Sequence, residues 1–199
     1  MAKEILGSVG ALIALGASLY YIYHIIKGST RPQRITWGVW ALAALLGFAT
    51  AKAGGAGPGV YVIAVYVFLT SIVFILSLFP KYGKPDREQY DFLVGFLAVS
   101  GIIAWKFFNL PLDFAAAVAV IADALALWPT LRGTWRQPDS EPIQVWAADA
   151  VAALFGVIAV TEKNFASMAF PVYLALGQTL IVIILLRRNL SKSHHRSSS

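Results

Sequence analysis

The chain has 199 residues, of which 58% are hydrophobic and only 13% are charged, and its formal net charge is +6. About a quarter of an ordinary soluble domain is charged, so this composition excludes a typical soluble protein and favours a lipid bilayer as the solvent. There is no cysteine, which excludes disulfides, thiolate metal ligands and thiol catalysis. Three dispersed histidines (His24, His194, His195) do not make a metal site. No metal, cofactor or nucleic-acid partner is therefore expected.

Seven apolar runs separated by short polar breaks predict seven transmembrane helices. Most runs approach the ~20 residues that cross ~30 Å of hydrocarbon at 1.5 Å per residue. In chain order they are Ile5–Ile26, Ile35–Thr50, Val60–Phe79, Tyr90–Phe108, Leu112–Leu131, Ile143–Val160 and Phe165–Leu186. The second run is short and is expected to extend toward Ala53. The first exceeds the apolar core of a signal peptide and no cleavage site follows it, so it is interpreted as a helix.

The distribution of lysine and arginine predicts the orientation. Four of these residues fall on the amino-terminal side: Lys3, Lys52, Lys106 and Lys163. Twelve fall on the other side: Lys27, Arg31, Arg34, Lys81, Lys84, Arg87, Arg132, Arg136, Arg187, Arg188, Lys192 and Arg196. The positive-inside rule then places the amino terminus outside and the carboxyl terminus in the cytoplasm, in a plasma (inner) membrane.

An internal repeat organises these helices. Residues Trp37–Gly47 align with Trp146–Gly156 at an offset of 109 residues, and Tyr66–Leu76 align with Tyr173–Ile183 at an offset of 107, which pairs Ser71 with Gln178. Because the offset spans four helices, both copies have the same orientation, as in a parallel repeat. The predicted fold is an all-α integral membrane protein of three, one and three helices. Its parts are a first repeat (1–79), a linker helix (80–110), a second repeat (111–190) and a disordered tail (191–199).

This arrangement resembles the SWEET sugar transporter and PQ-loop (MtN3-like) superfamily. Members carry a Pro-Gln pair near the cytoplasmic end of the first helix of each repeat, followed by a basic stretch. In the second repeat Pro129 matches that proline and Thr130 stands in place of the glutamine, whereas His24 stands at the corresponding proline of the first repeat. Ser71 and Gln178 stand at the depth of the family's sugar-binding asparagines. The resemblance implies a transporter that works by alternating access.

Four polar residues fall at one depth in four different helices. Asp123, Asp149, Ser71 and Gln178 each lie about 9–12 Å inside the cytoplasmic end of their run, counted at 1.5 Å per residue. An aspartate at a helix centre costs about 2.5–3.5 kcal/mol to insert, so such residues usually face a bundle interior or water. Carboxyls able to be protonated or ionised suit proton coupling or a cationic solute. Alternatively, each aspartate is protonated or capped by a hydroxyl and only links helices.

Other candidates are aromatic residues and prolines. Tyr66 and Tyr173 match across the repeat and could form an aromatic gate or simply pack in the core, and Trp40 could stack on a solute. Pro129 and Pro171 are expected bending points, because proline removes a helical hydrogen bond. Near helix ends, where interfacial anchoring is the usual role of tryptophan, lie Trp37, Trp105, Trp128, Trp135 and Trp146.

The leading hypothesis is a transporter of a small polar or cationic solute, with the lipid bilayer as its other partner and with homo-oligomerisation left open. The alternative is a non-transporting receptor or sorting protein of the same architecture, whose basic loops bind a partner or anionic lipid. A retinal photoreceptor is excluded because Phe165–Leu186 contains no lysine. An intramembrane aspartyl protease is disfavoured because Val120–Asp123 lacks the Gly-x-Gly-Asp motif. No catalytic residue is therefore expected, and the protein is not expected to be an enzyme.

Overall fold

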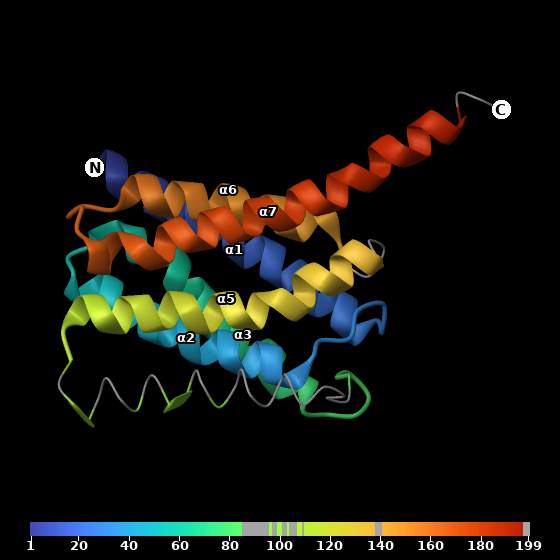
Figure 1. Cartoon of the computed structure of the whole chain (residues 1–199). Coiled ribbons are helices and arrows are strands. Elements are labelled where there is room, and N and C mark those ends of the chain that lie inside the picture. Colours follow the sequence, from blue (N-terminus) through green and yellow to red (C-terminus); the bar gives the residue numbers. More distant parts are fainter. Residues whose placement is uncertain are drawn as a thin grey trace.

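The computed structural model describes residues 1–84, 96, 99–100, 103, 107–108, 110–137 and 141–196, with side chains as far as Arg187. In these parts the chain forms six α-helices and no sheet (Figure 1). They are α1 (Ala2–Ile26), α2 (Arg34–Ala53), α3 (Val60–Ser77), α5 (Leu112–Arg136), α6 (Ile143–Ala159) and α7 (Phe165–Arg196), with a short 3₁₀ turn, η1 (Gly57–Gly59), before α3.

The helices have the length and polarity of membrane spans. Five of the described helices (α1, α2, α3 with η1, α5 and α7) are long and apolar enough to cross a bilayer, whereas α6 is apolar but has 17 residues. Their outward faces carry large apolar side chains, such as Leu12, Phe68 and Leu176, each more than 60% exposed. In a bilayer these side chains would contact lipid tails, so their apolar surface would not be exposed to water. The chain is therefore a multi-span helical membrane protein.

Six of the seven predicted runs correspond to described helices. The remaining run, the expected linker helix Tyr90–Phe108, lies largely outside the described residues, although residues 96, 99–100, 103 and 107–108 are helical. Helix α7 continues beyond the predicted end at Leu186 to Arg196, which differs from the predicted disordered tail. No proline or glycine follows Leu186 up to that point, and an established helix adds residues far more readily than it nucleates.

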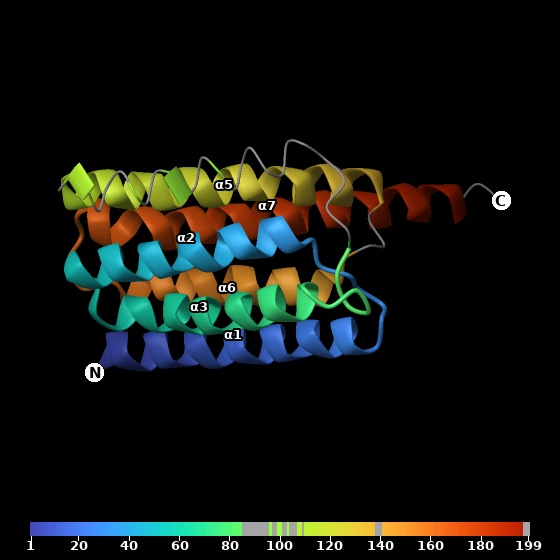
Figure 2. The ribbon, with the colours of Figure 1, turned by 90° about the horizontal axis from the view of Figure 1, so that it is seen from below.

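The first three and the last three described helices make the same contacts within each group. In the first half (α1–α3), α3 packs against both α1 and α2, and in the second half (α5–α7), α7 packs against both α5 and α6 (Figure 2). Between the halves, α1 packs along α6 and α2 along α5, while α2 also meets α7 and α3 meets α6. Exchanging α1, α2 and α3 with α5, α6 and α7 leaves this pattern of contacts unchanged.

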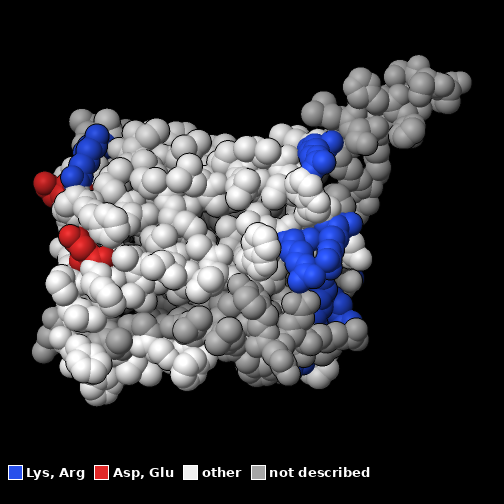
Figure 3. All heavy atoms as spheres, in the orientation of Figure 1, with Lys and Arg blue, Asp and Glu red and all other residues white. Residues whose placement is uncertain are grey.

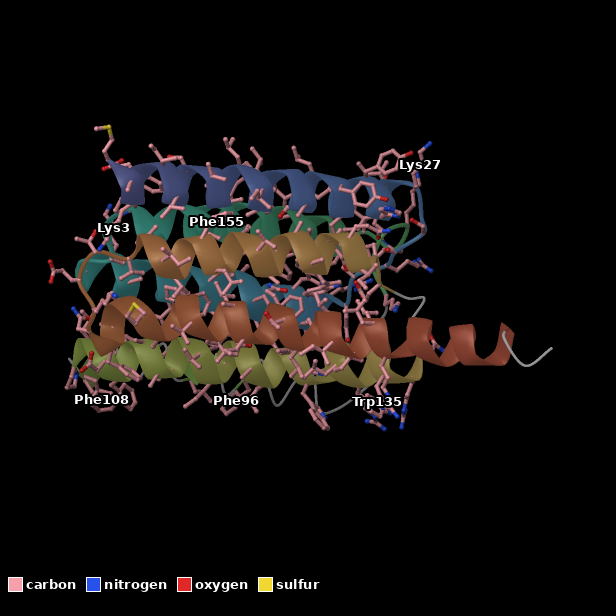
Figure 4. The ribbon with its side chains drawn as sticks, turned by 90° about the horizontal axis from the view of Figure 1, so that it is seen from above. Lys3, Lys27, Phe96, Phe108, Trp135 and Phe155 are labelled. Atoms are coloured by element: carbon pink, nitrogen blue, oxygen red, sulfur yellow. The ribbon has the colours of Figure 1, made fainter. Side chains whose placement is uncertain are left out.

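The two ends of the bundle differ in charge. The basic end holds the α1–α2 connection, the end of α3 and the segment between α5 and α6, and the opposite end holds the amino terminus and the α2–α3 and α6–α7 loops (Figure 1). Lysine and arginine gather at the basic end (Figure 3), and Lys27 and Trp135 lie far from Lys3 (Figure 4). The described cations at the basic end are Lys27, Arg31, Arg34, Lys81, Lys84, Arg132, Arg136 and Arg187.

Backbone hydrogen bonds join the two halves at the opposite end. The amides of Thr161 and Glu162, in the α6–α7 loop, donate to the carbonyls of Ala56 and Gly55 in the α2–α3 loop at 3.0 and 3.1 Å. Gly55 has a φ of 84°, a left-handed conformation that glycine adopts readily. From α1, Lys3 Nζ donates to Val160 O at 2.8 Å. The opposite end is thus joined by main-chain bonds, which remain available after side-chain substitutions other than proline.

Candidate solute site

A cavity with mainly apolar walls and a few polar groups lies between the two halves, from about the middle of α3, α5 and α7 to the first turns of α2 and α6. The space open to the centres of water-sized molecules is about 80 Å³, enough for several waters or one small solute. All six described helices contribute to it. The central cavity is lined by Ser18, Tyr21, Trp37, Trp40, Ala44, Tyr66, Leu69, Thr70, Val73, Asp123, Leu127, Val145, Trp146, Asp149, Tyr173, Leu174, Gly177 and Gln178.

Helical periodicity explains why these side chains converge. Residues three or four apart share one face of a helix, and each helix presents such a set to the cavity. On α3 the lining positions are Tyr66, Leu69, Thr70 and Val73, and on α7 they are Tyr173, Leu174, Gly177 and Gln178, so two of the four positions (Tyr66 with Tyr173, Thr70 with Gly177) correspond at the repeat offset of 107. The small residue Gly177 leaves room beside the larger side chains.

Asp123 links three helices. Its side chain on α5 is buried, and its Oδ2 accepts a hydrogen bond of 2.8 Å from the Tyr173 hydroxyl on α7. Its backbone carbonyl accepts a second bond, of 3.3 Å, from Trp40 Nε1 on α2. Asp123 is therefore bonded to two residues that were themselves predicted to belong to the site.

Asp149 has a similar environment on the other side of the cavity. Its side chain on α6 is equally buried, and the Tyr66 hydroxyl on α3 lies 3.3 Å from its Oδ1 and 3.1 Å from its backbone carbonyl oxygen. Tyr66 and Tyr173, which match across the predicted repeat, thus each bond a buried aspartate. The bond from Tyr66 crosses between the halves, whereas the bond from Tyr173 stays within the second half.

The ionisable groups of the cavity that could carry a charge near neutral pH are acidic. Its described lining includes two carboxyls and no lysine, arginine or histidine. Gln178 Oε1 is buried and has no hydrogen-bond partner among the described residues. A buried acceptor without a partner is costly, so a ligand that supplies a donor would stabilise it. The site is suited to a solute rich in N–H or O–H groups, or to a cation.

Ser71 does not belong to the cavity, although it was predicted with Gln178. Its hydroxyl bonds back to the carbonyl of Val67 on its own helix at 2.6 Å, and Thr70 lines the cavity instead. Adjacent residues on a helix point about 100° apart, so a one-residue difference moves a side chain off the cavity face.

Four aromatic side chains form a layer on the basic-end side of the central cavity. The ring centroids of Tyr21 and Trp37 are 5.1 Å apart, those of Trp37 and Trp40 are 5.1 Å apart, and those of Trp40 and Trp146 are 6.3 Å apart. The same four residues also line a second cavity of about 80 Å³, toward the basic end. This aromatic layer therefore separates the two spaces.

The layer corrects the sequence prediction for two tryptophans. Trp37 and Trp146 were expected to be interfacial anchors, but Trp146 is only 5% exposed and both pack inside the bundle. Trp128 and Trp135 are exposed as an anchor would be, and Arg187 lies 4.0 Å from the centroid of the Trp135 ring. Trp105 lies outside the described residues. The signal that distinguishes Trp37 and Trp146 is that they match each other across the predicted repeat.

Glu141 is a further residue of interest that the sequence prediction missed. It precedes α6 at the basic end, is half-buried, lines the second cavity and accepts a hydrogen bond of 3.3 Å from Trp146 Nε1. Desolvation raises the pKa of Glu141 to about 7, against the smaller lowering effects of Trp146, Lys84 and Tyr21. In the sequence it stands in a polar stretch between two apolar runs, where nothing marks it as buried.

The two predicted hinges occupy different places. Pro129 lies within α5 and lines the second cavity, whereas Pro171 is buried within α7 beside Phe170. Each proline removes one backbone hydrogen bond from its helix, which is why bending is expected there. Bending at either position stays a prediction.

Comparison of the chain with family models, curated proteins and solved structures gives no match. The functional argument therefore rests on the residues and geometry described above.

Proposed function

We propose that the protein is a transporter of the SWEET and PQ-loop type that moves a small donor-rich or cationic solute by alternating access. The observation that carries this proposal is the cavity between the two halves, into which two carboxyls and no lysine, arginine or histidine of the described residues project. Both carboxyls and an unpartnered amide oxygen face a space of solute size at mid-depth. Such a site at a repeat interface is the usual location of a substrate site in secondary transporters.

The pattern of helix contacts supports the proposed parallel repeat. The contacts within and between halves keep their form when the halves are exchanged. Several cavity residues are partners in the sequence alignment of the repeats, namely Trp40 with Asp149, and Tyr66 with Tyr173. Rocking one bundle against the other would then expose this shared site first to one end and then to the other.

The surrounding rings favour an organic cation over a hydrated metal ion. Trp37, Trp40, Trp146 and Tyr21 present aromatic surface on one side of the cavity, and a cation over an aromatic face gains about 0.5–2 kcal/mol. Asp123 and Asp149 supply the opposing negative charge when ionised. Protonation of one of them on solute release would couple transport to protons, which is the second part of the proposal.

The test is solute uptake by purified protein in liposomes, with and without a pH gradient. The probes are labelled small amines, guanidines and amino acids, each paired with a neutral isostere, together with sugars. We expect saturable uptake of cations and at least tenfold weaker uptake of their isosteres. Asp123→Asn and Asp149→Asn should each reduce uptake at least tenfold, whereas Asp113→Asn, which changes an aspartate in the first turn of α5, should not.

Two results would argue against transport. If no probe is taken up by folded protein, but a cation still quenches tryptophan fluorescence with a dependence on Asp123, then a receptor of the same architecture is favoured. If sugars are taken up and both asparagine variants behave as the wild type, then the carboxyls are only structural links.

A further inference from the structure

The second cavity and the aromatic layer raise the question of which end of the bundle opens. This cavity lies between the aromatic layer and the basic end, and its lining is more polar than that of the central cavity. Its residues come from both halves and from the segment after α3: Tyr21, Arg31, Pro32, Gln33, Thr36, Trp37 and Trp40 from the first half, Lys84 from that segment, and Pro129, Thr130, Gly133, Thr134, Glu141 and Trp146 from the second half. It forms a vestibule on the route from the central cavity to the basic end.

The two ends are held together in different ways. At the opposite end the halves are joined by backbone hydrogen bonds from Thr161 and Glu162 to the α2–α3 loop. At the basic end the side chain of Arg34 donates to Ser77 O within the first half, whereas the bonds from Lys84 N to Pro32 O and from Arg31 to Pro80 O join the first half to the segment that follows α3. A side-chain contact between the halves can be exchanged for water without unravelling a loop, and the basic end has such a contact at Glu141, so this end is suited to opening.

Glu141 makes such a contact between the halves. It belongs to the second half, and it is hydrogen-bonded to the hydroxyl of Tyr21 on α1, in the first half. It also interacts electrostatically with Lys84, in the segment that follows α3. It also accepts the bond from Trp146, one of the four rings of the layer. One side chain thus ties the first half to the second and fixes a ring that closes the central cavity.

We propose that the aromatic layer is the gate at the basic end and that Glu141 is the latch that keeps it closed in this structure. Opening separates Glu141 from Tyr21 and Lys84, releases the ring of Trp146 and joins the central cavity to the vestibule. The proposal rests on the proposed function for its purpose, but gate opening can be measured without any solute.

Protonation of Glu141 should make the opening of the latch depend on pH. The groups that face Glu141 are Tyr21 from α1, Trp146 from α6 and Lys84 after α3, and Arg31 lines the same vestibule. Burial raises the pKa of Glu141 from 4.5 to about 7 in the closed state, and opening to water would return the pKa toward 4.5. The closed state therefore holds a proton that the open state releases, so opening becomes easier as pH rises through this window.

The experiment uses the absence of native cysteine. Ser18, which lines the central cavity, is changed to cysteine, and its labelling by a membrane-impermeant thiol reagent is timed from the basic-end side in vesicles of known orientation. Rates are divided by those of Ser29→Cys, an exposed site at the same end, which removes the intrinsic pH dependence of the thiol. With Glu141 intact, the relative rate should rise between pH 5 and 7, by up to about tenfold per unit, and then level off.

Two substitutions of Glu141 should act in opposite ways. Glu141→Gln keeps a neutral acceptor for Tyr21 and Trp146, so labelling should stay slow and independent of pH. Glu141→Ala removes the acceptor, so labelling should be fast even at pH 5. Trp146→Phe, which removes the donor of the 3.3 Å bond, should also speed labelling at low pH. The matched control is Glu162→Ala at the opposite end, which should behave as the parent protein.

The latch is rejected if Ser18→Cys is labelled at the same rate in the parent protein and in its Glu141→Gln, Glu141→Ala and Trp146→Phe variants, in samples with unchanged thermal unfolding. A gate response without uptake of any solute would leave the gate standing and reject transport. Uptake that continues with no gate response would reject the latch and leave transport standing.

Discussion

Hydrogen bonds between tyrosine and aspartate are the main polar links at the level of single residues. Tyr173 donates to Asp123 at 2.8 Å inside the bundle, whereas Tyr61 donates to Glu4 at 3.4 Å on the surface. Interhelical hydrogen bonds in membrane proteins contribute about 0.6 kcal/mol on average and up to about 1.7 kcal/mol. The short bond of Tyr173 is expected near the upper value.

A double-mutant cycle measures this contribution. Tyr173→Phe and Asp123→Ala should each lower the free energy of unfolding by at least about 1 kcal/mol, and the double variant should lose less than their sum because both remove the same bond. Tyr61→Phe is the control and should change stability little. The measurement is reversible unfolding in mixed micelles, and strictly additive losses would show that the bond contributes nothing.

Glu141 predicts a dependence of stability on pH. Its pKa is raised from 4.5 to about 7 in the folded protein, so between these values the folded state binds the proton more tightly than the unfolded state. The free energy of unfolding should therefore be highest below about pH 4.5 for this group and fall as pH rises to 7. Comparison with Glu141→Gln isolates the effect, because the glutamine variant should lack this part of the slope. Identical pH profiles for the two proteins would contradict the raised pKa.

Sequence reasoning singled out the two aspartates because an acidic residue within an apolar run is conspicuous, and both line the central cavity. It also found Tyr66, Tyr173, Trp40 and Gln178, all of which line the central cavity. It missed Tyr21, which looks like one more aromatic residue near a helix end, and Glu141, which looks like a solvated loop residue. Both become significant only when α1 and the segment before α6, far apart in sequence, are brought into contact.

At the level of elements, the close approach of α2 and α7 depends on Gly47. A Cβ atom at this position would lie 2.4 Å from ring atoms of Phe170, whose side chain is fully buried. The ring has packed neighbours and cannot move aside freely. Gly47 and Phe170 together fill the bundle between the central cavity and the opposite end.

Substitution of glycine by alanine tests this contact. Gly47→Ala should destabilise the protein by about 1–3 kcal/mol, because overpacking a filled core costs this much. Gly16→Ala is the matched control on α1, where no atom lies within 4 Å of the added Cβ, and it should stabilise by about 0.5–1 kcal/mol through helix propensity. Melting temperatures in detergent give both values, and a neutral Gly47→Ala would show that α7 shifts easily.

The lengths and order of the helices were largely accessible from the sequence, because long apolar runs ending at glycine and proline are strong signals. The continuation of α7 to Arg196 was not, since the polar stretch after Leu186 has no hydrophobic period to indicate helix. Packing partners were also inaccessible: that α1 lies along α6, and α2 along α5, depends on tertiary contacts and not on any local pattern.

At the level of the whole molecule, the two ends differ both in their number of cations and in the hydrogen bonds described there. The end with most lysine and arginine holds the vestibule and Glu141, and the end with few cations holds the backbone bonds between the loops. If the positive-inside rule applies, the gate faces the cytoplasm and the closed loops face outside. The orientation in the membrane therefore determines which side of the membrane the proposed gate faces.

Single cysteines decide the orientation, since the chain has none of its own. Ser29→Cys lies exposed between α1 and α2 at the basic end, and Thr161→Cys lies exposed between α6 and α7 at the opposite end. With twelve cations on one side and four on the other, an impermeant maleimide should label Thr161→Cys in intact cells and Ser29→Cys only in inverted vesicles. The reverse pattern would turn the gate outward, and labelling of both sites in intact cells would indicate dual insertion, in which the cation bias does not set the topology.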